Sequence, residues 1–388
     1  MPRDPSGHVL DFRCLACGAT QPPSWDATTC LSPAHGEGAE RGILDVRYNY
    51  DGVRKQWKDA TGGGPGAGIW RWRPLLPIGA PDVPLLPVGG TPLVPAPRLA
   101  KRLGLGALWL KDETRNPTRS LKDRATAIAM AIAERQGAGT VCCASAGNAA
   151  ISLAGFAANA GVDCHVYVPR EASRDRLAWL ERYGAHVHVS LGNYDHAFDE
   201  CESAARSRGW YSRNCAYNPF LVEGKKTAAF EIVDALGGSV PDAVVAPVGD
   251  GCTLGALGKG FRELRLLGVT AAIPALVGVQ SEAVSPLVSR NRGEAWVDEG
   301  RSSRAASIAV RKPRNAVRVL AEVKESGGTL LAVTDDEMTA AQQSLSAEGG
   351  MVAEVTSAAT LAAVEALVAD GQLAGARVVL VITGGRWE

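Results

Sequence analysis

The chain contains the stretch Asn116-Pro117-Thr118-Arg119-Ser120-Leu121-Lys122-Asp123-Arg124, which places Lys122 at the predicted start of a helix. A predicted strand over residues 107–113 and a proline-containing turn come before it. The positive end of a helix macrodipole disfavours an ammonium ion, so a lysine at this position is expected to have a lowered pKa. An amine of that kind can condense with an aldehyde. Taken alone, the pattern also suits a solvated lysine in an ordinary first helical turn.

Two other turns follow predicted strands and open predicted helices. Ser145-Ala146-Gly147-Asn148 lies between a strand over 140–144 and a helix over 149–160, and its amides suit a carboxylate. Pro247-Val248-Gly249-Asp250-Gly251-Cys252-Thr253-Leu254-Gly255 follows a strand over 243–246, and its glycines let backbone amides approach a phosphate. It matches neither the Walker loop nor the dinucleotide fingerprint. Each turn alone could serve packing only.

A last predicted strand, over residues 376–382, ends in Thr383-Gly384-Gly385. The Thr383 hydroxyl can hydrogen-bond a pyridine nitrogen without forcing that nitrogen to stay protonated. The alternative is a plain turn at the end of a strand.

Predicted strands alternate with predicted helices along most of the chain, which is typical of parallel α/β sheets with helices on both faces. Ligands in such sheets lie beyond the carboxyl ends of the strands, where three of the four stretches fall. The predicted strands cover residues 107–113, 140–144, 163–168, 186–190, 243–248, 276–280, 329–333 and 376–383, and helices are predicted over 173–183, 194–207, 335–347 and 357–369.

Together these stretches resemble the fold-type II family of pyridoxal-phosphate (PLP) enzymes, and within it the threonine synthases. The resemblance runs from about residue 89 to 385 and preserves the order of its motifs. Further matching stretches are Gly90-Thr91-Pro92-Leu93, Leu110-Lys111-Asp112-Glu113, Glu223-Gly224-Lys225-Lys226-Thr227-Ala228-Ala229-Phe230-Glu231, Val279-Gln280-Ser281-Glu282, Ile308-Ala309-Val310 and Pro313-Arg314-Asn315. The resemblance implies two α/β lobes and a homodimer.

The resemblance also implies roles for the stretches described above. Lys122 would bind PLP covalently and, once freed, remove the substrate α-proton, with the PLP ring as electron sink. Asn148 would contact a ring hydroxyl and Thr383 the pyridine nitrogen. The amides of Gly249, Asp250, Gly251, Cys252 and Thr253 would bind the phosphate, with the Asp250 carboxylate pointing away, and Ser145, Ala146 and Gly147 would bind the substrate carboxylate.

The substrate is less sharply defined, because several residues depart from the threonine synthase pattern. Arg119 replaces a common glycine, and its guanidinium could bind a substrate anion or simply lie at the surface. Leu121 replaces phenylalanine, Ala146 and Ala149 replace hydroxyl residues, and Ala305-Ala306-Ser307-Ile308 lacks an acidic residue.

Several functions therefore remain open. The leading one converts O-phosphohomoserine into threonine and phosphate. The alternative is β-replacement or β-elimination on a phosphoserine-, serine- or threonine-like substrate in specialised biosynthesis. A catalytically silent PLP-binding regulator is a further reading, against which the intact Lys122 argues.

Composition fits a large globular enzyme. The 388 residues are 46% hydrophobic, and 41 basic residues balance 41 acidic ones, so no electrostatic signature of nucleic-acid or membrane binding is present. No apolar run has the length of a membrane span, and residues 1–5 lack the apolar stretch of a signal peptide, so we expect a cytoplasmic protein. Nine cysteines, an odd number, do not suggest a disulfide framework.

The N-terminal part is predicted to form a small cysteine-containing module over residues 1–60. Cys14-x-x-Cys17, Cys30 and His35 could supply four tetrahedral zinc ligands, or the module could pack without metal or recruit a partner. A Pro/Gly-rich linker is predicted over 61–98. The PLP catalytic part is predicted over 99–388, with a small lobe inserted at about 140–225.

Overall fold

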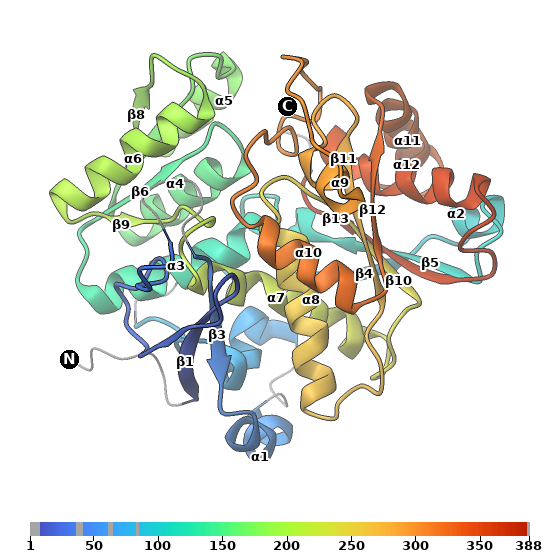
Figure 1. Ribbon diagram of the computed structural model, residues 1–388, viewed down its shortest axis with the longest axis horizontal. Coiled ribbons are helices and arrows are strands. Elements are labelled where there is room, and N and C mark those ends of the chain that lie inside the picture. The colour runs from blue at the N-terminus through green and yellow to red at the C-terminus, as the bar shows by residue number, and fades with distance from the viewer. Residues whose placement is uncertain (1–7, 36–41, 61–64, 83–84, 386–388) are drawn as a thin grey trace. The chain divides into compact units, whose positions relative to one another are not determined.

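The computed structural model describes residues 8–35, 42–60, 65–82 and 85–385 of the chain (Figure 1). The chain divides into two compact units, one made of Met1–Gly90 and Asn116–Lys225, the other of Thr91–Arg115 and Lys226–Glu388. The predicted boundaries at residues 60, 98, 140 and 225 for separate modules stay predictions. Residues 61–64, which hold the predicted glycine run of the linker, lie outside the described residues.

The first unit contains a four-stranded parallel sheet in the order β8-β7-β6-β9. Its strands are β6 (Thr140–Ala144), β7 (Asp163–Val168), β8 (His186–Val189) and β9 (Tyr211–Ser212). The helices α4 (Asn148–Ala160) and α6 (Tyr194–Arg208) pack on β6 and β7, whereas α5 (Arg174–Arg182) packs on α4 and β8. The helix α3 (Lys122–Gln136) packs on α4.

The helix α3 is a core helix. Every residue from Asp123 to Ala133 is buried. The run contains five alanines and one threonine, and these small side chains let neighbouring elements pack closely around the helix. It ends at Gly137, which takes the left-handed conformation with φ 70° that glycine adopts at helix ends. Burial on all sides fixes the helix that carries Lys122.

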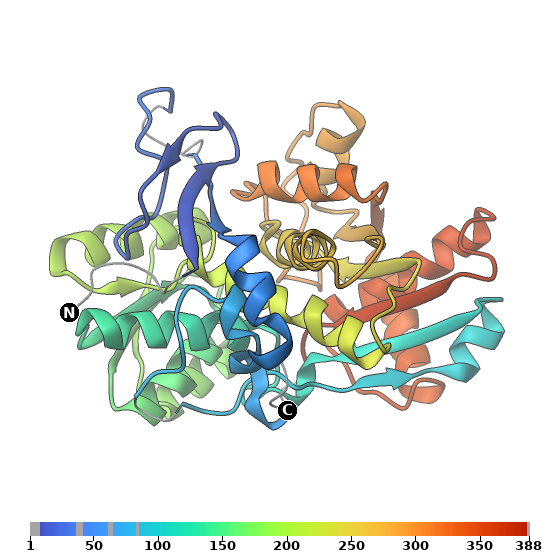
Figure 2. The same cartoon turned by 90° about the horizontal axis from the view of Figure 1, so that it is seen from below.

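The N-terminal residues of the first unit form a three-stranded antiparallel sheet in the order β2-β1-β3. It consists of β1 (Val9–Cys14), β2 (Thr20–Gln21) and β3 (Leu44–Tyr48), followed by α1 (Tyr50–Ala60) and the kinked 3₁₀ segment η2 (Pro65–Leu75), drawn in blue in Figure 2. Phe12 and Trp25 pack on Phe220, the first residue of α7 (Phe220–Ala235), with ring centroids 5.4 and 5.3 Å away. Tyr48 donates a hydrogen bond to Glu223 at 2.8 Å. Aromatic packing thus anchors this small sheet on the rest of the unit.

The second unit contains a six-stranded sheet in the order β12-β11-β10-β13-β5-β4, parallel except for the edge strand β4. Its strands are β4 (Leu93–Pro95), β5 (Ala107–Asp112), β10 (Ala243–Pro247), β11 (Ala275–Ser281), β12 (Thr329–Val333) and β13 (Arg377–Ile382). The central strands β10 and β13 read as continuous buried apolar runs, as expected for strands covered on both faces.

The helices of the second unit bury an aliphatic core against this sheet. They are α2 (Pro97–Arg102), α8 (Cys252–Leu266), α9 (Pro286–Arg292), α10 (Ala316–Glu325), α11 (Asp335–Ala347) and α12 (Val355–Ala369), and the short η3 (Glu113–Arg115) follows β5. α12 packs on β10, β11, β12 and β13 as well as on α11. Thr334 and Glu337 form a capping box that starts α11.

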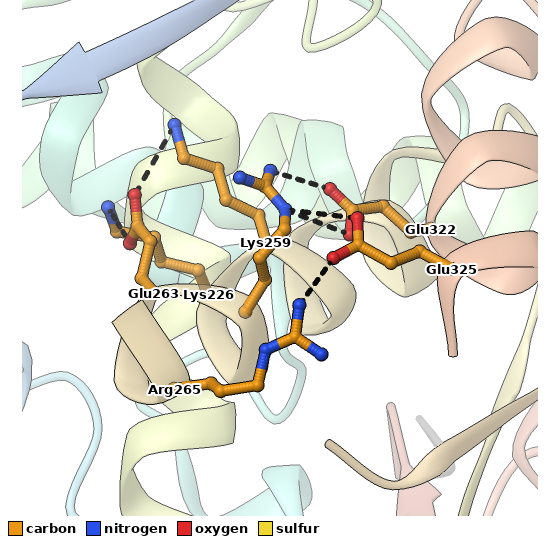
Figure 3. A network of polar contacts seen from close by, with 7 residues as sticks. Lys226, Lys259, Glu263, Arg265, Glu322 and Glu325 are labelled. Carbon is orange, nitrogen blue, oxygen red and sulfur yellow. Dashed lines mark hydrogen bonds and ion pairs between the residues drawn. The ribbon is translucent and has the colours of Figure 1, made fainter. Parts of the chain in front are cut away.

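A polar network links three helices of this unit (Figure 3). Lys226 of α7 lies 2.6 Å from Glu263 of α8, and Lys259 lies 3.7 Å from the same carboxylate, with all three side chains fully buried. On α8, Arg265 pairs with Glu325 of α10 at 2.8 Å. Removing one partner of the buried Lys226–Glu263 pair would leave the other charge uncompensated, whereas the Arg265–Glu325 pair is partly exposed.

Within the described residues, no helix combines the length and the apolar character needed to cross a membrane.

Candidate cofactor and substrate site

Lys122 is the first residue of α3, as the sequence predicted. Leu121 is the N-cap residue, and Ser120 Oγ accepts the Lys122 amide at 3.3 Å. The Lys122 carbonyl oxygen accepts hydrogen bonds from Thr126 Oγ1 at 3.1 Å and from the Arg213 guanidinium at 3.2 Å. The first turn of α3 is therefore fixed by its own threonine and by an arginine that follows β9.

The turn before Lys122 is closed by its own backbone. The Arg119 amide donates to the Asn116 carbonyl at 2.8 Å, and Asn116 Oδ1 accepts the Gly89 amide at 3.0 Å. Arg119 takes the left-handed conformation, with φ 59°, and its side chain is exposed. Side chains other than those of glycine, asparagine and aspartate rarely adopt this conformation. The structure thus explains why glycine would suit this position.

Asp123, next to Lys122, is fully buried and anchors the same turn. Its carboxylate accepts the Thr118 amide at 2.7 Å and the Thr118 hydroxyl. Burial raises the pKa of Asp123 to about 6, although hydrogen bonds from Ser152 and Thr118 and the charge of Arg213 lower it. The environment of this carboxyl therefore favours its neutral form more than water does.

Asn148 is the first residue of α4 and is buried. Ser152, one turn into α4, donates to Thr126, one turn into α3, with the two hydroxyl oxygens 2.7 Å apart. Thr126 and Ser152 each lie four residues, about 6 Å along the helix, after the first residue of their helices. The starts of α3 and α4, and so Lys122 and Asn148, are thereby brought into one region of the first unit.

Two backbone amides of the turn that precedes α4 already donate hydrogen bonds within the protein. The Ser145 amide donates to the Tyr167 carbonyl at 3.0 Å, and the Gly147 amide donates to Ser145 Oγ at 3.0 Å. Ala146 lies between them and is partly exposed. A carboxylate bound here would compete with the Ser145 hydroxyl for the Gly147 amide.

In the second unit, the predicted glycine-rich loop joins β10 to α8. Gly251, with φ 94°, is the N-cap residue of α8, which no described side chain caps, and Cys252 and Thr253 form its first turn. A Cβ on Gly251 would lie 2.9 Å from the Asn315 carbonyl oxygen, and one on Gly249 2.7 Å from that of Ser307. Packing alone therefore requires glycine at both positions, while the uncapped helix start suits an anion.

The side chain of Asp250 forms a hydrogen bond inside the same unit. Its carboxylate accepts the Arg314 amide at 3.2 Å, and its carbonyl accepts the Asn315 amide at 3.0 Å. Asp250 thus ties the loop to the stretch Pro313-Arg314-Asn315.

Thr383 follows β13 and is held by Ser357 of α12. The two hydroxyl oxygens lie 3.2 Å apart, and Ser357 Oγ accepts the Gly384 amide at 3.0 Å. Ser357 is fully buried. It fixes the position of the predicted pyridine-binding hydroxyl.

Three of the stretches that carry the resemblance meet in one buried network of the second unit. Lys111 donates to the Thr91 carbonyl and to Glu231, both at 2.6 Å, and the Thr91 hydroxyl donates to Glu113 at 2.7 Å. These charged residues therefore serve to join β5, α7 and the segment that enters the unit at Thr91.

The four predicted metal ligands also come together. The ligand atoms of Cys14, Cys17, Cys30 and His35 all lie within 4.8 Å of one another. The cysteines among them are free, as are the other six of the chain.

Sequence reasoning missed the supporting residues. Arg213 and Thr126 hold the Lys122 carbonyl, Ser357 holds Thr383, and Gln280 Oε1 accepts the amides of Leu287 and Val288 at 2.8 and 3.1 Å. Only Gln280 lay in a stretch that the sequence had singled out. Thr126 and Ser357 are single polar residues inside helices, and Arg213 follows the short strand β9, so no local pattern marks them.

Comparison with known proteins shows the family to which the chain belongs. Residues 85–384 match the family described as pyridoxal-phosphate dependent enzyme. A threonine synthase of Methanosarcina acetivorans is 34% identical over 97% of this chain and 91% of its own length. A threonine synthase of Halalkalibacterium halodurans is 36% identical over 81% of this chain and 88% of its own length.

Solved structures share the fold. An L-serine ammonia-lyase from Rhizomucor miehei has a TM-score of 0.66 at 22% identity, covering 76% of this chain and 93% of its own. The processed form of threonine deaminase isoform 2 from Solanum lycopersicum has a TM-score of 0.64 at 19% identity, covering 77% of this chain and 84% of its own. The chain belongs to the fold-type II family of pyridoxal-phosphate-dependent enzymes and is a threonine synthase-like lyase within it.

Proposed function

We propose that the protein acts on an amino acid with a leaving group at the β- or γ-carbon, and that its substrate is O-phosphohomoserine, converted into threonine and inorganic phosphate. The proposal is supported by relatives named threonine synthase that match 81 to 97% of this chain. It rests above all on one observation: Lys122 begins a buried helix whose first turn is fixed by Arg213 and Thr126.

The residues present fit PLP. Lys122 supplies an amine at the start of α3, the uncapped start of α8 supplies amides for a phosphate, and Thr383 supplies a hydroxyl held in place by Ser357. Asn148, buried at the start of α4, supplies a side-chain amide for a ring hydroxyl. Bound PLP would supply the electron sink that stabilises negative charge at the substrate α-carbon.

Lys122 then has two roles. Its Nζ would hold the cofactor and would also carry the proton removed from the substrate α-carbon. The hydrogen bonds of Arg213 and Thr126 go to the Lys122 carbonyl rather than to its amine, so they hold the backbone while the side chain moves. Arg213 and Thr126 are positioning residues in this mechanism.

The phosphate of PLP would be held by the amides of Gly249, Asp250, Gly251, Cys252 and Thr253. The side chain of Asp250 is turned to its bond with the Arg314 amide, so only its backbone takes part. Thr383 would donate its hydroxyl hydrogen to an unprotonated pyridine nitrogen. A neutral hydroxyl at this position would suit elimination better than transamination.

The substrate anions would be held in the first unit. Ser145, Ala146 and Gly147 would bind the α-carboxylate at the start of α4, and the exposed guanidinium of Arg119 would bind the substrate phosphate. Because Ala146 and Ala149 carry only methyl groups near the start of α4, the contribution of Arg119 to anion binding would be correspondingly larger.

The same methyl groups favour a second candidate. They depart from the threonine synthase pattern, which keeps β-replacement or β-elimination on a phosphoserine-, serine- or threonine-like substrate as the alternative. Both candidates need Lys122 and the same cofactor, and they differ in which carbon loses its leaving group.

Phosphate release separates the candidates. The holoenzyme is incubated with O-phosphohomoserine and, separately, with O-phosphoserine, while phosphate and amino-acid products are measured together. We expect phosphate and threonine in equal amounts from O-phosphohomoserine. Phosphate from O-phosphoserine alone, with no turnover of O-phosphohomoserine, would reject the lead in favour of the second candidate.

Two variants control this assay. Lys122→Ala should lose turnover and the visible absorbance of lysine-bound cofactor. Lys101→Ala, at an exposed lysine of α2, should keep both. Turnover at the wild-type rate in Lys122→Ala would reject the catalytic assignment.

We further propose that the enzyme is cytoplasmic, which its nine free thiols support. The homodimer expected from the resemblance stays a prediction, and light scattering on the purified holoenzyme measures it.

A further inference from the structure

We propose that Cys14, Cys17, Cys30 and His35 bind one zinc ion as a structural site, separate from the PLP chemistry. Their ligand atoms all lie within 4.8 Å of one another, and they are the one group of this kind found in the described residues. The site combines three sulfurs with one imidazole nitrogen, a donor set typical of structural zinc.

Two of the separations between ligand atoms are close to those in a tetrahedron around zinc. Bonds of about 2.3 Å to sulfur and about 2.0 Å to nitrogen place two sulfurs about 3.8 Å apart and a sulfur and a nitrogen about 3.5 Å apart. The structure has Cys17 Sγ 3.8 Å from Cys30 Sγ, and Cys14 Sγ 3.3 Å from His35 Nε2. Both separations are those of atoms that share a metal, and the sulfurs are far too distant for a disulfide, which needs about 2.05 Å.

The backbone around the ligands is shaped for close approach. Gly18, with φ 76°, turns the chain directly after Cys17, and its amide donates to the Cys14 carbonyl at 3.0 Å. The Ser32 amide points at Cys30 Sγ from 3.4 Å, a contact that stabilises a thiolate. The site is therefore built from two turns that present sulfur and backbone amides together.

Gly42 lies so close to the ligand residues that no side chain fits at its position. A Cβ added to it would lie 2.6 Å from His35 Nε2, 2.7 Å from Cys14 Sγ and 2.6 Å from Cys30 Cβ. The Gly42 carbonyl accepts the Cys30 amide at 2.9 Å. The backbone at Gly42 thus closes one side of the ligand cluster, and three ligands depend on the absence of a side chain there.

All four positions of the tetrahedron come from the protein, which indicates a structural ion, since catalytic zinc keeps one position open for water or substrate. Between the end of β1 and the start of β3, the described residues contain one strand, β2, of two residues. Such a stretch buries little apolar surface and gains most from a metal crosslink.

The crosslinked stretch also contacts the helix that carries Lys122. Asp26 accepts a hydrogen bond from Gln136, the last residue of α3, at 2.9 Å, and Trp25 packs on Phe220. Zinc would therefore order a surface that supports the C-terminal end of α3, about 21 Å along the helix from Lys122.

The experiment measures metal directly. The full-length holoenzyme, purified without a histidine tag or added metal and washed with a mild chelator, is analysed by elemental mass spectrometry. We expect one zinc per chain. Replacement by cobalt alone should give the visible absorption of a tetrahedral cobalt–thiolate site.

Matched variants show whether the four residues are the ligands. Cys17→Ser and His35→Ala should lower zinc affinity at least about tenfold, and Gly42→Ala should weaken it through crowding. Cys215→Ser, at a cysteine outside the cluster, should keep one zinc per chain. If Cys17→Ser and His35→Ala keep the zinc content of the wild type, the assignment is wrong.

A second measurement does not depend on folded variants. Titrating the wild-type thiols with a mercurial should release zinc in step with modification, with one zinc freed per chain. Absence of zinc from the washed wild type, together with no cobalt–thiolate absorption, would overturn the proposal. Neither result would alter the cofactor absorbance, so a failure here is distinguishable from a failure of the proposed reaction.

Discussion

Arg119 is held in a backbone conformation that glycine would adopt at lower cost. A left-handed conformation costs a residue with a Cβ about 1–2 kcal/mol relative to its usual regions. The turn imposes this conformation, because the Arg119 amide is bonded to the Asn116 carbonyl and Lys122 must follow at the start of α3. A strained arginine close to the proposed catalytic lysine points to a contribution from its side chain.

Replacement of Arg119 by glycine and by alanine separates strain from binding. Both variants lose the guanidinium, so both should lower kcat/KM for an anionic substrate roughly tenfold to a hundredfold, mainly through KM. Only glycine relieves the strain, so Arg119→Gly should be about 1 kcal/mol more stable than Arg119→Ala. Steady-state kinetics and thermal unfolding measure the two effects.

The control is Arg115→Ala, at another exposed arginine of the same segment. It should leave kcat/KM unchanged. Unchanged kinetics in both Arg119 variants, for an anionic and a neutral substrate alike, would remove Arg119 from the site.

Asp123 makes stability depend on pH. Its pKa is raised from 3.8 to about 6 by burial, so between these values the folded protein binds more protons at this group than the unfolded chain does. Stability from this group is present below about pH 4 and falls as pH rises to about 6, by roughly 3 kcal/mol in all. Asp123→Asn cannot titrate, and its side-chain oxygen can still accept the Thr118 amide.

The measurement compares melting temperatures of Asp123→Asn and wild type from pH 4 to pH 7. The variant should gain on the wild type as pH rises to about 6, and the difference should be constant above that. A difference that does not change with pH would mean that the Asp123 pKa lies near its ordinary value.

The sequence predicted the positions of the candidate site residues in the fold better than the residues that support them. Lys122 and Asn148 were expected at helix starts, and the structure has them there, because a strand, a turn and an alanine-rich run mark such starts locally. Ser357 and Arg213 act across the fold on Thr383 and Lys122. Their partners are distant in sequence, so no local pattern identifies them.

At the scale of elements, α3 and α7 approach each other at a glycine. A Cβ on Gly224 would lie 2.0 Å from the Arg124 carbonyl oxygen, inside the first turn of α3. Gly224→Ala must therefore push the two helices apart, since the carbonyl belongs to the helix backbone and cannot swing away as a flexible side chain would. We expect a loss of stability of at least about 1–3 kcal/mol, the usual cost of overpacking, and weaker cofactor retention because Lys122 lies on that turn.

Gly139→Ala is the matched control, because a Cβ there would meet nothing within 4 Å. Thermal unfolding and PLP content of the two variants are compared. Equal melting temperatures for Gly224→Ala and Gly139→Ala would show that the helices can separate without cost.

Elements with strong patterns were predicted closely, and short ones were missed. The predicted strands over 140–144, 163–168 and 329–333 and the helix over 335–347 match β6, β7, β12 and α11 residue for residue. The strands β4 and β9 have three and two residues and exist only through pairing with β5 and β6. Pairing of this kind is tertiary, and a run of two or three residues carries no period to detect.

At the scale of the whole molecule, the order of elements was predictable and the grouping of chain segments was harder. Residues 1–90 group with 116–225, whereas 91–115 group with the C-terminal part. The segment 91–115 supplies β4 and β5 to the second sheet, held there by Lys111 and its bonds to Thr91 and Glu231. The placement of residues 91–115 in the second unit depends on buried contacts between residues more than a hundred positions apart, such as Lys111 and Glu231.

The two proposed ligands of the molecule should be separable. Lys122 and the cysteine cluster belong to different elements, and the stretch held by zinc contacts α3 at Gln136, about 21 Å along the helix from Lys122. Lys122→Ala should therefore lose the absorbance of lysine-bound PLP and keep one zinc per chain.

Cys30→Ser should lose zinc and melt at a lower temperature, because the crosslink is gone. It should keep the absorbance of lysine-bound PLP below its melting temperature. Elemental analysis, absorbance spectra and melting curves on the same preparations provide the measurement. Loss of PLP from folded Cys30→Ser, or loss of zinc from Lys122→Ala, would show that the two sites depend on each other.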